Sequence, residues 1–168
     1  VLKGLNKHRF DKRLQANIRY RIRGCGKFKV YSRQSIVYVE PADDAADVDA
    51  AFEALKTVFG IITMTRAAAC EKDRDAVAKL AVEYLRDAML CAKSFKVETR
   101  RGDKSFPMTS IELSQFVGGE LSDAYPNVPV DVHHPELTVN IEIRDYAAYV
   151  HGPSVPGAGG MPLESNGR

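Results

Sequence analysis

The sequence has no long run of apolar residues, and this absence excludes a transmembrane helix. A helix that spans a bilayer needs about 18 or more consecutive, predominantly apolar residues, and no stretch of the 168 residues approaches that length. The opening residues Val1-Leu2-Lys3-Gly4 also contain no apolar leader segment with a cleavage pattern. We therefore expect a cytoplasmic protein with no membrane partner.

Cysteine is scarce, and metal-ligand spacing is missing. The three cysteines, Cys25, Cys70 and Cys91, are an odd number without a CxxC pair, which favours a reducing compartment over a disulfide framework. No local signature supports a cysteine–histidine nucleophile pair. The residues that could ligate a metal are Asp131, His133, His134, Glu136 and His151. Adjacent histidines would point to opposite sides of a strand, so we expect no metal site and no catalytic residue.

The composition is that of a folded chain with segregated charge. Hydrophobic residues make up 45% and charged residues 27%, which is enough for a core in one ordinary domain or two small ones. The net charge is only +2, but residues 1–33 carry eleven Lys or Arg against the single acid Asp11. Residues 40–53 carry six acids and no base, and a second basic cluster lies at 93–104. Two separated basic clusters favour a polyanionic partner such as nucleic acid over a solvated helix face.

The first half of the chain predicts the element order α-β-β-α-β. Apolar residues at four-residue spacing indicate a helix from Asn6 to about Arg23. Residues 28–31 and 35–39 alternate as a hairpin, residues 47–58 form a second helix, and residues 61–64 begin a strand. A ferredoxin-like unit has the order β-α-β-β-α-β, so we expect that fold without its first strand.

The second half predicts a second α/β domain. Residues 73–89 read as an amphipathic helix and residues 94–99 as a strand. After a loop over 100–108, Thr109 and Glu112 form a capping box that opens a helix to about Ala124. Gly118-Gly119 costs that helix stability and allows close backbone packing. Residues 138–143 and 146–150 alternate as an antiparallel pair, and the Gly- and Pro-rich residues from 152 onward read as a linker.

Four segments together carry a resemblance to a known family. They are Lys3-Gly4-Leu5-Asn6-Lys7 with Phe10, Val58-Phe59-Gly60-Ile61, the run from Phe95 through Arg100-Arg101, Lys104, Phe106-Pro107 and Ser110 to Glu112-Leu113, and Gly157-Ala-Gly-Gly-Met-Pro162. In this order they resemble the tRNA 4-thiouridine synthetases, also called tRNA sulfurtransferases or ThiI proteins, and the third resembles the signature of a THUMP domain. The resemblance implies an α+β protein with three parts. These are an incomplete N-terminal ferredoxin-like domain over 1–69, a THUMP domain over 70–152, and a linker over 153–168 toward an ATP-pyrophosphatase domain that this sequence does not contain.

The sequence departs from the family pattern at both ends. It has no initial strand ending in an RYGE-like segment and no SGGxDS phosphate loop, and Leu163-Glu164 stands where the family has Val-Gly. The resemblance implies that the parent protein transfers sulfur to a tRNA uridine using ATP with magnesium. It also implies a homodimer and a cysteine desulfurase as sulfur donor. We expect this chain by itself to hold no cofactor and to perform no catalysis.

The expected RNA-binding residues form two groups. Arg100, Arg101 and Lys104 lie in the loop before a helix N-terminus, where cationic forks and backbone amides suit phosphate; Phe106 offers a face to an unpaired base, and Lys96 shares the strand face of Arg100. The first helix contributes contacts to the acceptor stem that are independent of sequence: Lys3, Lys7, Arg9, Lys12 and Arg13. If about six of these residues meet phosphates, log K should fall against log salt with a slope of roughly −5.

Two other functions remain open at this point. The same THUMP domain precedes methyltransferase, pseudouridine synthase and deaminase domains in other tRNA-modifying enzymes. Alternatively, the basic face meets an acidic protein rather than RNA. An unpaired tRNA 3′ end distinguishes THUMP recognition from binding of an acidic protein, because only THUMP recognition depends on it. The residues that follow this sequence in the parent protein would distinguish the enzymes: an SGGxDS loop indicates the sulfurtransferase, and a methyl-donor motif indicates the alternative.

Overall fold

The computed structural model describes residues 2–159, with side chains from residue 12 onward. It divides into two compact units. Unit 1 runs to Met64 and also includes the segment from Val155, whereas unit 2 is Thr65–Ser154. Among the helices within the described range, none combines the length and apolar character that a bilayer crossing needs.

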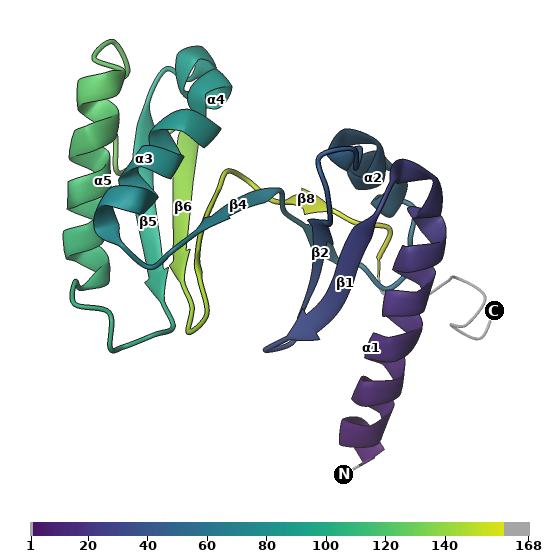
Figure 1. The fold of residues 1–168 in the computed structure, drawn as a ribbon. Helices are drawn as coiled ribbons and strands as arrows, with labels where there is room; N and C mark the ends of the chain where they lie inside the picture. The colour runs from purple at the N-terminus through teal and green to yellow at the C-terminus, as the bar shows by residue number, and fades with distance from the viewer. Residues whose placement is uncertain (1, 160–168) are drawn as a thin grey trace. The chain divides into compact units, whose positions relative to one another are not determined.

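Unit 1 is built on a hairpin packed beside a long helix (Figure 1). Its elements are α1 (Leu2–Arg21), the 3-10 turn η1 (Arg23–Cys25), β1 (Phe28–Arg33), β2 (Ile36–Pro41), α2 (Val48–Leu55), β3 (Thr63–Met64) and β8 (Val155–Pro156). β1 and β2 pair antiparallel from Phe28 opposite Pro41 to Arg33 opposite Ile36. Gln34 and Ser35 both have positive φ, at 50° and 66°, which suits the twist of a tight hairpin turn. The predicted α-β-β-α-β order is confirmed.

The core of unit 1 follows the predicted apolar stripe. Leu14 and Ile18 of α1 and Ile22 directly after it are all buried, within one cluster with Val30 and Leu55. Residues four apart lie on one helix face, which is why this spacing buries them together. The strands form two separate two-stranded sheets, β1-β2 and β3-β8, rather than one.

The segment after residue 152 differs from the predicted linker. Val155 pairs with Met64 and Pro156 with Thr63 in antiparallel register, so this part of the tail belongs to unit 1. Two further backbone bonds extend the contact, from Gly157 N to Ile62 O at 2.9 Å and from Gly159 N to Ile61 O at 3.0 Å. Periodicity could not reveal such a strand, because a two-residue pairing carries no alternation.

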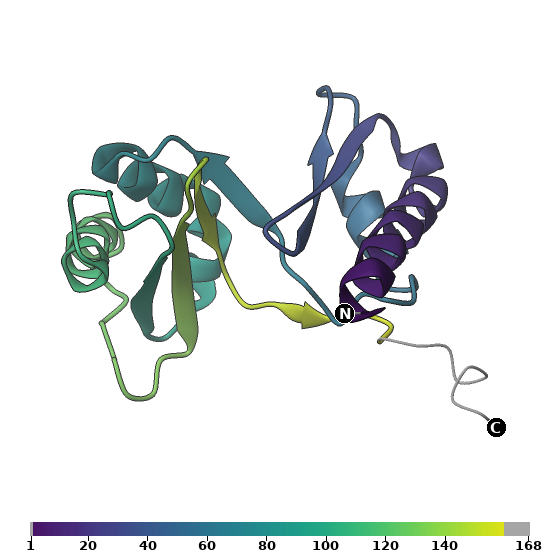
Figure 2. The same ribbon diagram turned by 90° about the horizontal axis from the view of Figure 1, so that it is seen from below.

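Unit 2 is a four-stranded mixed sheet with helices packed against it (Figure 2). Its elements are β4 (Ala67–Cys70), α3 (Arg74–Tyr84), α4 (Arg86–Cys91), β5 (Phe95–Arg101), α5 (Ser110–Ala124), β6 (Leu137–Ile143) and β7 (Ala148–His151). The strand order is β4-β7-β6-β5; only the β5–β6 pair is parallel, and α5 connects those two strands. Both units combine helices with mainly antiparallel strands, so the predicted α+β class is confirmed.

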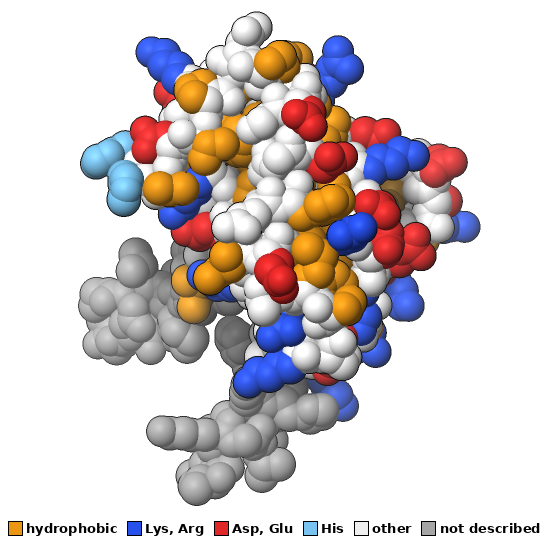
Figure 3. All heavy atoms as spheres, turned by 90° about the vertical axis from the view of Figure 1, so that its left-hand side faces the viewer, with side chains coloured by type: hydrophobic (Ala, Val, Ile, Leu, Met, Phe, Trp, Pro, Cys, Tyr) orange, Lys and Arg blue, Asp and Glu red, His pale blue; other side chains and the backbone are white. Residues whose placement is uncertain are grey.

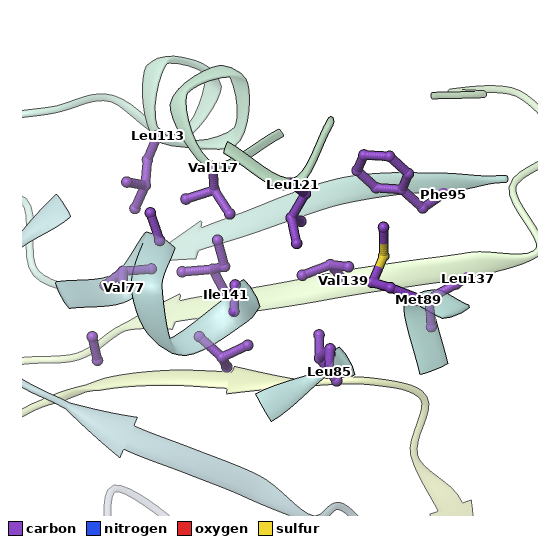
Figure 4. Packing of buried hydrophobic residues seen from close by; sticks show 14 of the residues in the cluster. Val77, Leu85, Met89, Phe95, Leu113, Val117, Leu121, Leu137, Val139 and Ile141 are labelled. Atoms are coloured by element: carbon purple, nitrogen blue, oxygen red, sulfur yellow. The ribbon is translucent and has the colours of Figure 1, made fainter. Parts of the chain in front are cut away.

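The core of unit 2 lies between the sheet and its helices. Leu113, Val117 and Leu121 point from α5 toward Val139 and Ile141 of β6 (Figure 4), and all five are at most 1% exposed. The capping box of α5 is confirmed: Thr109 Oγ1 accepts from the Glu112 amide at 3.1 Å, and Glu112 Oε1 accepts from the Thr109 amide at 2.8 Å.

Two features of unit 2 differ from the sequence prediction. The helix predicted over 73–89 is two helices, because the backbone leaves helical geometry at Leu85, with φ −98° and ψ 20°. The buried Leu85 side chain belongs to the core at this break. β4 was not predicted: its Ala67-Ala-Ala-Cys70 sequence has no alternation, and pairing with β7 creates it.

Candidate nucleic-acid interface

The loop after β5 is held in place by its own side chains. Arg101 Nη1 donates to Phe106 O at 3.0 Å and to Lys104 O at 3.3 Å. Asp103 Oδ1 accepts from the Ser105 amide at 3.0 Å, and the Gly102 amide donates to Ile143 O at 2.7 Å. The loop therefore presents a fixed backbone at the N-terminus of α5, where the helix dipole favours an anion.

Lys72 ties this loop to the start of α3. Its Nζ lies 2.5 Å from Asp103 Oδ2 and 2.8 Å from Asp145 O. The hydrogen bond from Lys72, together with those from Ser105, lowers the pKa of Asp103 to about 2. The carboxylate therefore stays ionised at neutral pH and neutralises Lys72. Sequence reasoning missed this pair because 31 residues separate its members.

Phe106 does not have the role that the sequence suggested. It is 6% exposed and belongs to the core cluster of unit 2. A ring buried in this way cannot stack on a base, so the stacking role is corrected to core packing. Arg101 is also less available to a phosphate, because one of its guanidinium nitrogens already donates to the loop carbonyls.

The remaining basic residues of the loop region differ in availability. Lys104 and Arg100 are exposed. Lys96 Nζ lies 2.5 Å from Glu98 Oε1, and its side chain is 26% exposed. Lys96 and Arg100 alternate with Arg101 along β5, so they lie on the sheet face opposite α5. Lys104 and Arg100 are thus the cations in best position to meet phosphate.

A shallow hollow of about 320 Å³ lies beside the loop, lined by Lys72, Asp73, Arg74, Phe106, Pro107 and Met108. The Arg74 guanidinium lies over the Phe116 ring, with its carbon 4.9 Å from the ring centroid. Arg74 was also missed from sequence, since a single arginine at the start of a helix carries no signal of its own.

The basic residues of unit 1 spread over α1 and the hairpin. Lys12 and Arg13 are exposed, as predicted; Lys3, Lys7 and Arg9 fall outside the residues whose side chains are described. Arg19 donates from Nη2 to Val30 O at 2.8 Å, joining α1 to β1. Lys29 lies with its Nζ 5.2 Å from the Tyr31 ring centroid, and Arg23 stacks 3.8 Å from that of Tyr20. Lys29 and Tyr31 of the hairpin, and Tyr20 and Arg23 before it, thus add basic and aromatic groups that the expected RNA-binding residues did not include.

The histidine-rich segment before β6 forms a turn. Asp131 Oδ1 accepts from the His133 amide at 3.1 Å and from the His134 amide at 3.0 Å, and these bonds lower the pKa of Asp131. Across the described part of the chain, no group of three or more potential ligands is placed to hold a metal ion.

Comparison with known families places both units. Residues 1–65 match the family described as the ThiI ferredoxin-like domain, and residues 71–151 match the THUMP domain. The fold and these matches define a protein of the ferredoxin-like plus THUMP class.

The curated relatives that this chain resembles are tRNA sulfurtransferases. A protein named "Probable tRNA sulfurtransferase" from Alkaliphilus oremlandii is 40% identical over 171 residues, covering 100% of this chain and 43% of the relative. One of the same name from Caldanaerobacter subterraneus is 40% identical over 168 residues, with the same coverage. The chain contains a ThiI ferredoxin-like domain and a THUMP domain, and it is similar to the corresponding region of these tRNA sulfurtransferases. It spans less than half the length of the curated relatives that it matches.

Solved structures agree with this fold. PH1313 from Pyrococcus horikoshii superposes with a TM-score of 0.78 at 26% identity, over 94% of this chain and 53% of that one. A 4-thiouridine synthetase in complex with RNA and bound ATP gives a TM-score of 0.79 at 22% identity, over 95% of this chain and 40% of that one. The second likeness, at its lower identity, concerns the fold alone.

Proposed function

We propose that this chain is the tRNA-binding region of a tRNA 4-thiouridine synthetase. It recognises the acceptor region and the unpaired 3′ end, so that a catalytic domain of the parent protein can thiolate a tRNA uridine. The observation that carries the proposal is the ordered basic loop at the N-terminus of α5, within a THUMP domain whose curated relatives are named tRNA sulfurtransferases.

The chemistry of the loop suits phosphate near a strand end. Lys104 and Arg100 supply exposed charge, while Asp103 and Lys72 hold the backbone that carries the α5 amides. In unit 1, Lys12 and Arg13 supply phosphate contacts that do not depend on base identity. Double-stranded RNA would then be read by shape rather than by base edges.

Further properties of the parent protein follow from the family as proposals. Its reaction would use ATP with magnesium, bound outside this chain, and a cysteine desulfurase would deliver sulfur. The parent would act as a homodimer in the cytoplasm, for which the three free cysteines are suited. THUMP-containing methyltransferases, pseudouridine synthases and deaminases are the alternative parents, but the match of residues 1–65 to the ThiI ferredoxin-like domain favours the synthetase.

Binding of the purified chain to tRNA with and without its unpaired 3′ end tests the proposal, at two salt concentrations. We expect salt-sensitive binding that weakens when the end is trimmed. Lys104→Glu should abolish the preference for the intact end, whereas Lys79→Glu, an exposed lysine on α3, is the charge-matched control. Equal binding of intact and trimmed tRNA by the unchanged chain would contradict recognition of the 3′ end.

A further inference from the structure

A groove between β5 and α5 does not include the basic loop residues Lys104 and Lys72, although Arg100, at the edge of β5, borders both the groove and that loop. Its volume is about 680 Å³. Residues of β5 form one wall and residues of α5 form the other, and Val130 and Val132 also line it. Ile111, Val130 and Val132 are 70%, 52% and 60% exposed. Figure 3 shows hydrophobic side chains gathered on the face of the molecule that presents α5, with acidic side chains among them.

The β5 wall of the groove is an open sheet edge. β5 ends the strand order: β6 pairs with one side of it, and on the other side the described chain makes an isolated bridge at Phe95. Phe95 turns its backbone groups away from β6: its amide donates to Pro129 O at 3.0 Å, and its carbonyl accepts from the Asp131 amide at 2.9 Å. Because these directions alternate along a strand, the amides and carbonyls of Val97 and Thr99 also point toward the groove. No described backbone segment pairs with them.

The chain itself shows that this edge accepts a strand. Residues 129–131 pair with Phe95 in parallel, as an isolated bridge, and then turn away at Asp131. The remaining edge, from Val97 to Arg101, offers the same alternating donors and acceptors over about 13 Å. An extended peptide would continue the pairing that residues 129–131 begin.

The α5 wall has a stripe of small residues beside the larger Ile111 and Gln115. Ser110, Ser114, Gly118 and Ser122 recur every four residues and all line the groove, so they share one helix face. The sequence suggested that the two glycines allow close backbone packing, and the structure does not bear this out. A Cβ on Gly118 would meet nothing nearer than Val97 Cγ2 at 3.8 Å, and one on Gly119 would meet nothing within 4 Å. Each glycine costs a helix roughly 0.8–1 kcal/mol relative to alanine, and that cost leaves the groove open.

The charges around the groove argue against a polyanion in it. Glu98 and Arg100 line it, and Glu112 and Asp123 lie on α5 seven residues before and four residues after Gly119, so they share its helix stripe. All four side chains are exposed. Glu98 is also paired with Lys96, which leaves the carboxylates of Glu112 and Asp123 beside the Arg100 guanidinium. This excess of negative charge favours an apolar segment with basic residues over a phosphate backbone.

We propose that the groove between β5 and α5 receives an extended, mostly apolar peptide segment of a protein partner, which adds to the edge of β5 as a strand. Strand addition to an exposed edge draws affinity from main-chain hydrogen bonds and specificity from pockets for alternate side chains. Here the main-chain bonds come from Val97 and Thr99, and the pockets lie over Gly118 and between Ile111 and Val132. This function is additional to tRNA binding and does not depend on it.

Selection from a displayed library of short peptides on the full chain tests the proposal. We expect enrichment of peptides with alternating apolar residues and Lys or Arg near their ends. Binding of a synthetic copy should slow hydrogen exchange of the Val97 and Thr99 amides by about tenfold or more, as new edge hydrogen bonds require. The same peptide N-methylated at alternate residues should not bind, because it has lost the donors on one edge.

Two pairs of variants separate the walls of the groove. Val97→Pro removes one outward amide donor, and an edge strand tolerates proline. The variant should weaken peptide binding about 3- to 10-fold, which is the contribution of one hydrogen bond. Val97→Ala keeps the amide and is its control. Gly118→Leu fills the groove and should weaken binding by about tenfold or more, with Gly118→Ala as control, since bulk in the pocket displaces the peptide side chain. Circular dichroism checks the fold of each variant.

Three results would overturn the proposal. One is a selection that enriches no peptide able to protect Val97 and Thr99. Another is protection of the same amides by a short single-stranded RNA, with Gly118→Leu weakening its binding, which would make the groove a nucleic-acid site. The third is concentration-dependent self-association that protects these amides without any peptide, which would make a second copy of the chain the occupant.

Discussion

Replacing Glu142 by glutamine removes a charge at the centre of a three-residue cluster on the sheet of unit 2. Glu142 Oε2 lies 2.8 Å from His151 Nε2, and Oε1 lies 2.6 Å from Arg144 Nη2. The other ring nitrogen of His151, Nδ1, lies 2.8 Å from Gly152 O. Both ring nitrogens therefore face acceptors, and only the doubly protonated imidazolium can donate to both.

The size of the effect follows from the displaced pKa values. The hydrogen bond from His151, with that from Arg144, lowers the pKa of Glu142 from 4.5 to about 2. In return, Glu142 raises the pKa of His151 above 6.5, while burial and, more weakly, nearby Arg100 oppose that rise. The difference between 4.5 and about 2 in the pKa of Glu142 corresponds to about 3 kcal/mol. The Glu142 side chain is 24% exposed, so solvent screening reduces the expected loss to roughly 1–2 kcal/mol.

The pH dependence of stability follows from the lowered pKa of Glu142 and the raised pKa of His151. The contribution of Glu142 is complete above its unfolded pKa of 4.5 and is lost as pH falls toward about 2. The contribution of His151 is complete below 6.5 and is lost as pH rises through its raised folded pKa. Glu142→Gln should therefore be most destabilising between about pH 4.5 and pH 6.5, and less so on either side.

Urea unfolding at about pH 3, pH 5.5 and pH 9 measures this difference, with the methyl signals of Ile141 as a probe confined to unit 2. Glu120→Gln, an exposed carboxylate on α5, is the matched control and should change stability little at any pH. If Glu142→Gln lowered stability equally at all three pH values, the charged pair would not be the source, and the reasoning from the two ring nitrogens would be refuted.

Three other outcomes are expected. Phe106→Ala should lower the free energy of unfolding of unit 2 by about 3 kcal/mol without RNA present, because a buried ring is lost; an unchanged urea midpoint with weakened RNA binding would restore the stacking role. Gly119→Ala should raise stability by roughly 0.5–1 kcal/mol through helix propensity, since its Cβ meets nothing within 4 Å; a thermal melt showing a loss would contradict that. Replacing Lys12 and Arg13 together by glutamine should make the slope of log K against log salt for tRNA binding less steep by about 2, and an unchanged slope would place these residues away from phosphate.

Pattern alone located most of the regular elements and the family. The four-residue spacing of Leu14, Ile18 and Ile22 fixed the buried face of α1, because helical geometry places such residues together whatever surrounds them. The capping box at Thr109 was equally local and equally correct. The ordered set of motifs identified the ThiI family, since it depends on residue identity and order.

Tertiary contacts decided the features without local signal. β4 and β8 exist because distant strands offer them hydrogen bonds, and the split at Leu85 arises within a packed core. The burial of Phe106, the Lys72–Asp103 pair and the open edge of β5 all depend on which segments the fold brings together. Local sequence pattern thus determined most of the helices and strands and the charges they carry. Packing determined the strands that have no local signal and which side chains are left free to meet a partner.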